Sequence, residues 1–198
     1  MESKSERTRI FILEKVSPIF NQKGFAGTSL RDLTEVTGLT KGALYAHFQN
    51  KEDLAIESLR YNIFKVLEPL SHQLQSSRSP IQKLILIADY YTSYYDMVKP
   101  LGGCPLLKVG MDTRNLNTRL FEKVKSFARK LENQLKEIIL EGINRQEIKS
   151  EISPDHYASL FYSMIEGSIF MAFLQDDPEY LTKISLQLKK LIQQDLLF

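Results

Sequence analysis

The sequence predicts an all-α protein with a small N-terminal helical unit and a larger helical unit behind it. Apolar residues recur at three- or four-residue spacing along most of the 198 residues, and no stretch alternates polar and apolar residues as a β-strand would. The chain shows no internal repeat. Its hydrophobic content of 43% is sufficient for a buried core at this length.

The first expected helix contains a proline, Pro18. A proline in a helix interior removes a backbone hydrogen bond and costs about 3 kcal/mol. We therefore expect a kink between Glu14 and Pro18.

Two short helical patterns then flank one glycine in residues 28–51. Ser29 is expected to cap the first of them, because Asp32 follows three residues later as a capping-box partner. Gly38 ends this helix, since glycine takes the left-handed C-terminal conformation without a side-chain penalty. The apolar stripe of the helix consists of Leu30, Leu33 and Val36.

The second short helix is expected over residues 40–48, with Thr40 as its cap and with Leu44 and Phe48 buried. Gly42 lies inside it, although glycine is about 1 kcal/mol worse than alanine as a helix former. Close approach of the backbone to an external surface would explain this residue. The pattern is that of a helix-turn-helix whose second helix can lie in a DNA groove. The side chains and backbone expected to point outward are those of Thr40, Lys41, Gly42, Ala43, Tyr45 and His47.

The rest of the chain is expected to be helical. A turn is expected at residues 76–80 and a break at residues 100–105, where glycine and proline cluster. Ser153 and Pro154 are expected to cap and begin the penultimate helix. The expected helices cover residues 50–75 with a bend at Pro69, 81–98, 106–111, 117–144, 154–174 and 178–196.

Composition limits the classes of function. Residues 1–51 hold eight Lys or Arg against five Asp or Glu, so the positive charge of the chain is concentrated at the N-terminal end. One cysteine excludes an intramolecular disulfide, and the three histidines lack metal-ligand spacing, so we expect neither a metal site nor a cofactor. We expect no enzyme, since no nucleophile elbow, phosphate loop or metal cluster is present. Residues 1–9 are polar and charged, unlike a signal peptide, and a cytoplasmic location is expected.

Residues 157–174 form an apolar stretch of about 18 residues, close to the lower limit for crossing a bilayer. Glu166 lies at its centre, where a carboxylate would be costly in lipid. The small residues Ser163 and Gly167 instead suit close helix packing. We expect a helix packed on its own domain and on a partner chain, and no membrane association.

The ordered sequence of residues 41–54, KGALYAHFQNKEDL, strongly resembles the recognition helix and following helix of the tetracycline-repressor (TetR) family of bacterial transcription regulators. Phe20, Gly24, Phe25 and residues 28–33 are similar to the first two helices of that family. The resemblance is specific over about residues 7–59 and weak beyond them. Thr34 departs from the family pattern, which usually has alanine at the helix crossing, and so does Pro18.

The resemblance implies roles for nine residues in binding double-stranded DNA. Ser29 and Arg31 would lie where the first helix of the motif touches the groove rim. The residues implied to hold phosphates are Thr40, Tyr45, His47 and Lys51, and those implied to face base edges are Lys41, Gly42 and Ala43.

The resemblance further implies two domains, a DNA-binding domain at residues 1–50 and a ligand-binding and dimerisation domain at residues 51–198. The last two helices, residues 156–196, would pair with their copies in a homodimer. The implied function is a repressor of a nearby operon, released from a near-palindromic operator by a small apolar or aromatic effector. A ligand-independent, nucleoid-type DNA binder with the same fold is the alternative.

The effector site is open to two interpretations. Tyr91 and Tyr95 belong to a run of four tyrosines that can pack in the core or form a pocket wall. Cys104 follows two glycines and precedes a possible helix start, so it is either a small buried turn residue or a thiol that senses electrophiles. Tyr91, Tyr95 and Cys104 are the candidate ligand-binding residues.

Overall fold

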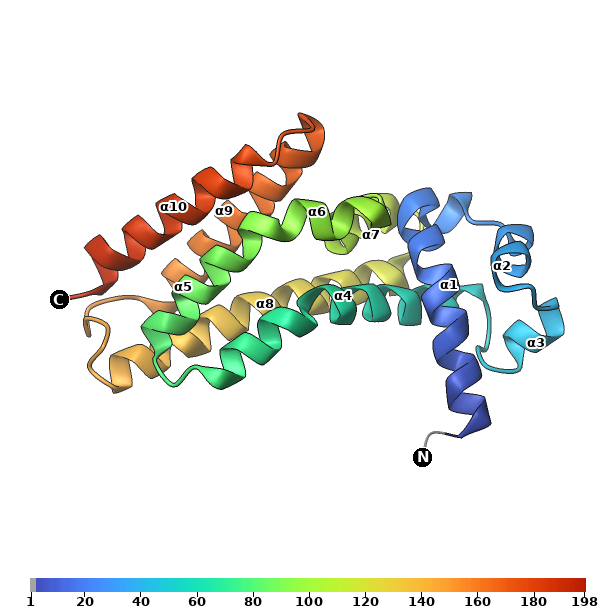
Figure 1. The fold of residues 1–198 in the computed structure, drawn as a ribbon, viewed down its shortest axis with the longest axis horizontal. Coiled ribbons are helices and arrows are strands. Elements are labelled where there is room, and N and C mark those ends of the chain that lie inside the picture. The colour runs from blue at the N-terminus through green and yellow to red at the C-terminus, as the bar shows by residue number, and fades with distance from the viewer. Residues whose placement is uncertain (1–2) are drawn as a thin grey trace. The chain divides into compact units, whose positions relative to one another are not determined.

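The computed structural model describes residues 3–198, and within this range every regular element is a helix (Figure 1). The predicted all-α class is therefore confirmed. The first elements are α1 (Lys4–Gly27), α2 (Leu30–Thr37), α3 (Lys41–Tyr45) and α4 (Lys51–Ser76). They are followed by α5 (Pro80–Tyr90), η1 (Tyr91–Ser93), α6 (Tyr94–Val98), η2 (Lys99–Leu101), α7 (Pro105–Thr113), α8 (Thr118–Asn144), α9 (Pro154–Leu174), α10 (Glu179–Leu191) and the π-helical η3 (Ile192–Leu196).

The chain divides into two compact units. The first unit ends at Val66 and also includes Val98–Ser126, and the second comprises Leu67–Met97 and Phe127–Phe198. The long helices α4 and α8 each contribute residues to both units. These units are defined by how compactly the residues pack and not by function. The predicted boundary at residue 50 between a DNA-binding and a ligand-binding domain stays a prediction.

Helix α1 contains Pro18, yet its backbone leaves helical dihedral angles at Gly24, with φ 75° and ψ 173°. The break expected between Glu14 and Pro18 is thus found at Gly24. The lost hydrogen bond and the ring clash of a proline leave its φ helical, whereas glycine alone reaches a left-handed φ without a side-chain penalty. The turn at Gly24 lies directly before the helix-turn-helix.

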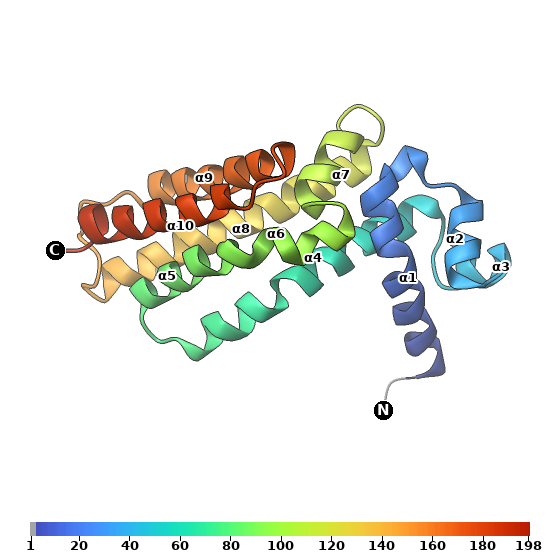
Figure 2. The same cartoon turned by 45° about the horizontal axis from the view of Figure 1, so that its top comes forward.

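The first unit gathers α1, α2, α3, the start of α4, and α7 around one core (Figure 2). Helix α1 packs against both α2 and α7. Asn62 of α4 donates a buried hydrogen bond of 2.9 Å to the carbonyl oxygen of Ser17 in α1. The fully buried side chains of this unit include Ile12, Val16, Leu33, Leu44, Leu54 and Leu120.

In the second unit, α9 and α10 pack side by side and α10 also packs on α5 (Figures 1 and 2). Ser153 caps α9 by accepting from the His156 N–H at 3.3 Å, and Pro154 is the first helical residue, as predicted. The single helix expected over residues 81–98 is divided instead, because η1 interrupts it after Tyr90.

Helix α9 has one long solvent-exposed face. Phe170 and Leu174 on it are 54% and 60% exposed, although both are large and apolar. The helix is long and apolar enough to cross a membrane by length and composition, with 21 residues and a mean hydropathy of 1.3. Its exposed face consists of Ser159, Ser163, Gly167, Phe170 and Leu174.

Candidate nucleic-acid interface

The scaffold of the interface is α2, which is capped at both ends as predicted. Ser29 Oγ accepts from the Asp32 N–H at 3.1 Å, and Asp32 Oδ2 accepts from the Ser29 N–H at 2.7 Å. Lys23 forms an ion pair with Asp32, and this contact together with the Ser29 bonds holds the pKa of the Asp32 carboxyl well below its usual range. At the other end Gly38 has φ 68° and donates to the Thr34 carbonyl at 2.9 Å.

Helix α3 follows after a single turn. Thr40 Oγ1 accepts from the Ala43 N–H at 3.2 Å, which confirms the predicted cap. Leu44 and Phe48 are 0% and 2% exposed, so the predicted buried face is also confirmed. The helix ends at Tyr45, earlier than predicted, because the His47 N–H bonds to the Leu44 carbonyl and the last turn tightens.

Gly42 has no neighbour that requires a glycine. A Cβ built at this position would meet Thr40 Oγ1 at 4.0 Å and nothing closer. Its conformation is helical, so no positive φ demands glycine either. The chain itself therefore gives no reason for this residue, and close approach of α3 to an external surface stays a prediction.

The predicted contact residues differ in exposure. Arg31 projects into solvent and pairs with Glu35, with 2.6 Å between Nε and Oε1. The exposed candidates are Ser29, Arg31, Thr40, Lys41 and Gly42, and the half-buried ones are Ala43, Tyr45, His47 and Lys51.

Lys51 is bound within the chain. Its ammonium donates to the Phe25 carbonyl at 2.6 Å and lies 4.6 Å from the centroid of the Phe25 ring. Desolvation lowers the pKa of Lys51, while the charges of Asp112 and Asp32 act in the opposite direction. An ammonium has three donors, so the observed bond leaves capacity for the predicted phosphate contact.

The sequence did not identify the groups that hold the end of α1. Phe25 donates its N–H to Asp112 Oδ2 at 2.6 Å, and Asn21 donates to the carbonyls of Leu101 and Gly103. These partners are 80 to 87 positions apart. No local pattern signals such contacts, because capping and periodicity concern only neighbouring residues.

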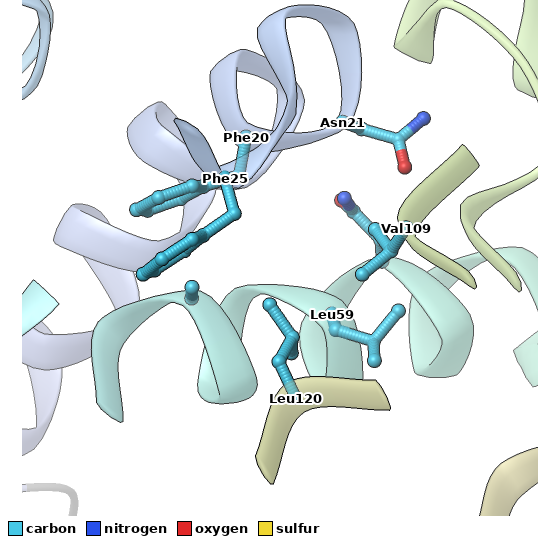
Figure 3. A pocket seen from close by; sticks show the side chains of 8 residues that line it. Phe20, Asn21, Phe25, Leu59, Val109 and Leu120 are labelled. Atoms are coloured by element: carbon cyan, nitrogen blue, oxygen red, sulfur yellow. The ribbon is translucent and has the colours of Figure 1, made fainter. Parts of the chain in front are cut away.

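A small cavity lies in the core of the first unit, between α1, α4, α7 and the start of α8 (Figure 3). Its volume is about 10 Å³, which suits a single water molecule and is too small for an organic effector. The cavity is lined by Phe20, Asn21, Phe25, Ala55, Leu59, Asn62, Val109 and Leu120.

Two of the candidate effector residues lie in the second unit. Tyr95 is 3% exposed, stacks on Phe173 with 4.6 Å between ring centroids, and donates to Asp176 Oδ1 at 3.0 Å. Tyr91 is 6% exposed and lies 5.2 Å from the Tyr94 ring. Both side chains thus pack in the core, and a role in ligand binding stays a prediction.

Cys104 lies in the first unit and is 2% exposed. It precedes α7 at the N-cap position without a side-chain capping bond. This burial agrees with a packing role and leaves the sensor role a prediction.

Residues 12–57 match the family profile described as bacterial regulatory proteins, tetR family, and residues 80–188 match the profile described as Tetracyclin repressor-like, C-terminal domain. An uncharacterized HTH-type transcriptional regulator of Bacillus subtilis, YxaF, is 28% identical over 193 residues, which cover 92% of this chain and 94% of that protein. A TetR-family transcriptional regulator from Cytophaga hutchinsonii has a crystal structure with a TM-score of 0.88 and 34% identity, covering 99% of this chain and 98% of that one.

The fold is also shared with FadR of Bacillus subtilis, whose crystal structure is a complex with stearoyl-CoA. That similarity has a TM-score of 0.76 at 19% identity and covers 93% of this chain and 97% of FadR.

Proposed function

Because the chain belongs to the tetR family of bacterial regulatory proteins, it is a DNA-binding transcription regulator, and we propose that it represses a nearby operon until a small apolar molecule releases it. The proposal rests on the exposed surface of α3. This short capped helix presents Lys41 and Gly42 to solvent, and the chain itself provides no reason for the glycine.

In this proposal α3 lies in the major groove. Lys41, Gly42 and Ala43 face base edges, and the backbone at Gly42 approaches the DNA most closely. Thr40, Tyr45, His47 and Lys51 hold phosphates on either side, while Ser29 and Arg31 lie at the groove rim. Arg31 must then exchange its exposed ion pair with Glu35 for phosphate, at a small cost because such surface pairs contribute little.

The regulator acts as a homodimer in this proposal, through α9 and α10. The exposed face of α9 carries Phe170 and Leu174 beside small residues, which supports close helix packing against a second copy. The two recognition helices would then read half-sites roughly 34–36 Å apart, or a multiple of that distance. Dimerisation is therefore part of operator recognition.

The test is binding to duplex DNA from the region upstream of the protein's own gene. The purified protein should shift this DNA, and the logarithm of the binding constant should fall linearly with the logarithm of salt concentration by about 0.9 per phosphate contact. Absence of any shift at low salt and micromolar protein would contradict the proposal.

The effector is proposed to be apolar and to bind near Tyr91 and Tyr95. FadR of Bacillus subtilis was crystallised with stearoyl-CoA, a ligand with a long apolar acyl chain, which supports an effector with apolar character. An effector releases DNA only if it binds the non-operator conformation more tightly, and a shift from 1:99 to 99:1 requires about 5.5 kcal/mol of preference.

A thermal-shift screen of acyl-CoA, phenolic, quinone and cationic compounds tests the effector proposal. Running the screen on wild type and on Cys104→Ser separates the two interpretations of the thiol. A hit lost in the variant supports a sensor thiol, and a hit retained assigns Cys104 to packing. A screen without hits favours the ligand-independent DNA binder.

A further inference from the structure

The backbone of Phe25 is held from two sides. Its N–H donates to the carboxylate of Asp112 at the end of α7, with 2.6 Å between the nitrogen and Oδ2. Its carbonyl accepts from the ammonium of Lys51, the first residue of α4, also at 2.6 Å. Phe25 therefore joins an anion on α7 to the cation that begins α4. Both bonds involve a charged group, which makes them stronger than bonds between neutral groups.

Gly24 makes the approach of Asp112 possible. A Cβ at position 24 would lie 2.8 Å from Asp112 Oδ1, closer than real Cβ atoms come to other atoms. The φ of Gly24 is also positive, at 75°. The glycine thus serves two purposes: it turns the chain towards α2 and it admits the carboxylate to the Phe25 N–H.

A second contact fixes the other end of α7. The buried Asn21 side chain donates to the carbonyls of Leu101 and Gly103 at 2.8 and 2.9 Å. These carbonyls flank Gly102, which has φ 82°. Helix α7 is therefore attached to α1 before its first residue, through Asn21, and near its last residue, through Asp112.

We propose that Asp112 and Asn21 are positioning residues for DNA binding, because they attach both ends of α7 to the C-terminal part of α1, on either side of Gly24, and so set the place of the helix-turn-helix and of Lys51. The inference rests on the proposed function and adds to it two residues that support DNA binding from outside the contact surface. Neither residue is among the proposed DNA contacts.

Electrostatics and positioning make opposite predictions for Asp112→Ala. Removing a negative charge from a DNA-binding unit should strengthen binding to phosphates if the charge is the whole effect. Loss of the contact to Phe25 should instead weaken binding, by about tenfold if one charge-assisted hydrogen bond is lost from the bound geometry. The sign of the change in DNA affinity therefore distinguishes an electrostatic effect from a positioning effect.

The experiment measures affinity by fluorescence anisotropy for a duplex that the wild-type dimer selects from a random library. Glu14→Ala is the matched control, because Glu14 is an exposed carboxylate of α1 in the same unit. Asp112→Ala and Asn21→Leu should each bind about tenfold more weakly than wild type.

Two results would overturn the inference. One is Asp112→Ala binding as tightly as Glu14→Ala, and the other is Asn21→Leu binding as tightly as wild type. If circular dichroism shows that Asp112→Ala does not fold, Asn21→Leu decides through the second contact: its affinity should still fall about tenfold. Wild-type protein that selects no duplex refutes the proposed function, while hydrogen exchange of the Phe25 amide in Asp112→Ala, which should be faster than in wild type, still tests the contact.

Discussion

At the scale of single residues, the glycines of the first unit have different physical reasons. Gly38 needs its left-handed conformation, and Gly24 needs both its conformation and the space for a carboxylate. Gly42 needs neither, since it is helical and has open space where a side chain would be. The difference separates glycines that the fold requires from Gly42, for which the fold gives no reason.

Replacing Gly42 by alanine should therefore separate stability from function. We expect Gly42→Ala to raise the free energy of unfolding by about 0.5–1 kcal/mol, because alanine is the better helix former. The same substitution should weaken DNA binding, since its Cβ would occupy the space between α3 and the groove. Urea denaturation and anisotropy on one preparation measure both quantities. Equal DNA affinity in the variant would remove the reason proposed for this glycine.

The buried carboxyl of Glu166 makes the stability of the folded chain depend on pH. Burial raises the pKa of its carboxyl from 4.5 to about 7, partly opposed by a hydrogen bond from Tyr162, and its Oε2 atom has no partner among the described residues. The folded chain retains a proton that the unfolded chain releases above its ordinary pKa. The stabilisation from this group is therefore complete below about pH 4.5 and is lost as pH rises through about 7.

Glu166→Gln should consequently reduce the loss of stability between pH 5 and 8. A shift of this size corresponds to an upper limit of about 3 kcal/mol, and 1–3 kcal/mol is the expected change at about pH 8. Chemical denaturation at several pH values measures it, with the exposed Glu151→Gln as control. A pH profile that is the same in Glu166→Gln and wild type would show that the carboxyl is solvated.

At the scale of elements, local signals predicted the helix-turn-helix well. Ser29, Asp32, Gly38 and Thr40 act within three or four positions of themselves, and all of their predicted caps occur in the structure. Contacts between distant parts of the chain determine the features that these local signals did not predict. Helix α3 ends early, and the contact of Asp112 with Phe25 spans 87 positions.

In α3 and the turn that follows it, the proposed base contacts and phosphate contacts should respond differently to substitution. Lys41→Ala should change which sequence is preferred, by about 1–3 kcal/mol for each lost base contact. His47→Ala should weaken binding to all sequences alike. Selection of duplexes from a random library by each variant gives the comparison. A preferred sequence identical in Lys41→Ala and wild type would move Lys41 to the phosphate contacts.

At the scale of the whole molecule, the family assignment agrees with the resemblance found in the sequence. The identities of the effector and the operator depend on the partner molecules as well as on this chain. The resemblance was confined to about residues 7–59, yet the family match extends over residues 80–188 as well. The spacing of apolar residues in the larger unit is the same as in any helical core. The sequence therefore predicted that Tyr91 and Tyr95 either pack in the core or line a pocket, and it did not distinguish these two roles.

The exposed face of α9 leads to the last prediction, which concerns assembly. A Cβ at Gly167 would meet no atom within 4 Å in the single chain, so Gly167→Arg should leave the fold of the protomer intact. In a dimer packed through α9, the same arginine would bury a charge between two closely spaced helices. Light scattering should then find monomers at micromolar concentration, and operator affinity should fall because one protomer reads only one half-site.

Gln82→Arg is the control for this prediction, since Gln82 is exposed on α5 and its substitution adds the same charge to the same unit. If Gly167→Arg remains dimeric, the subunits meet through another surface; if it becomes monomeric with unchanged operator affinity, pairing of the half-sites is not what holds the regulator on DNA.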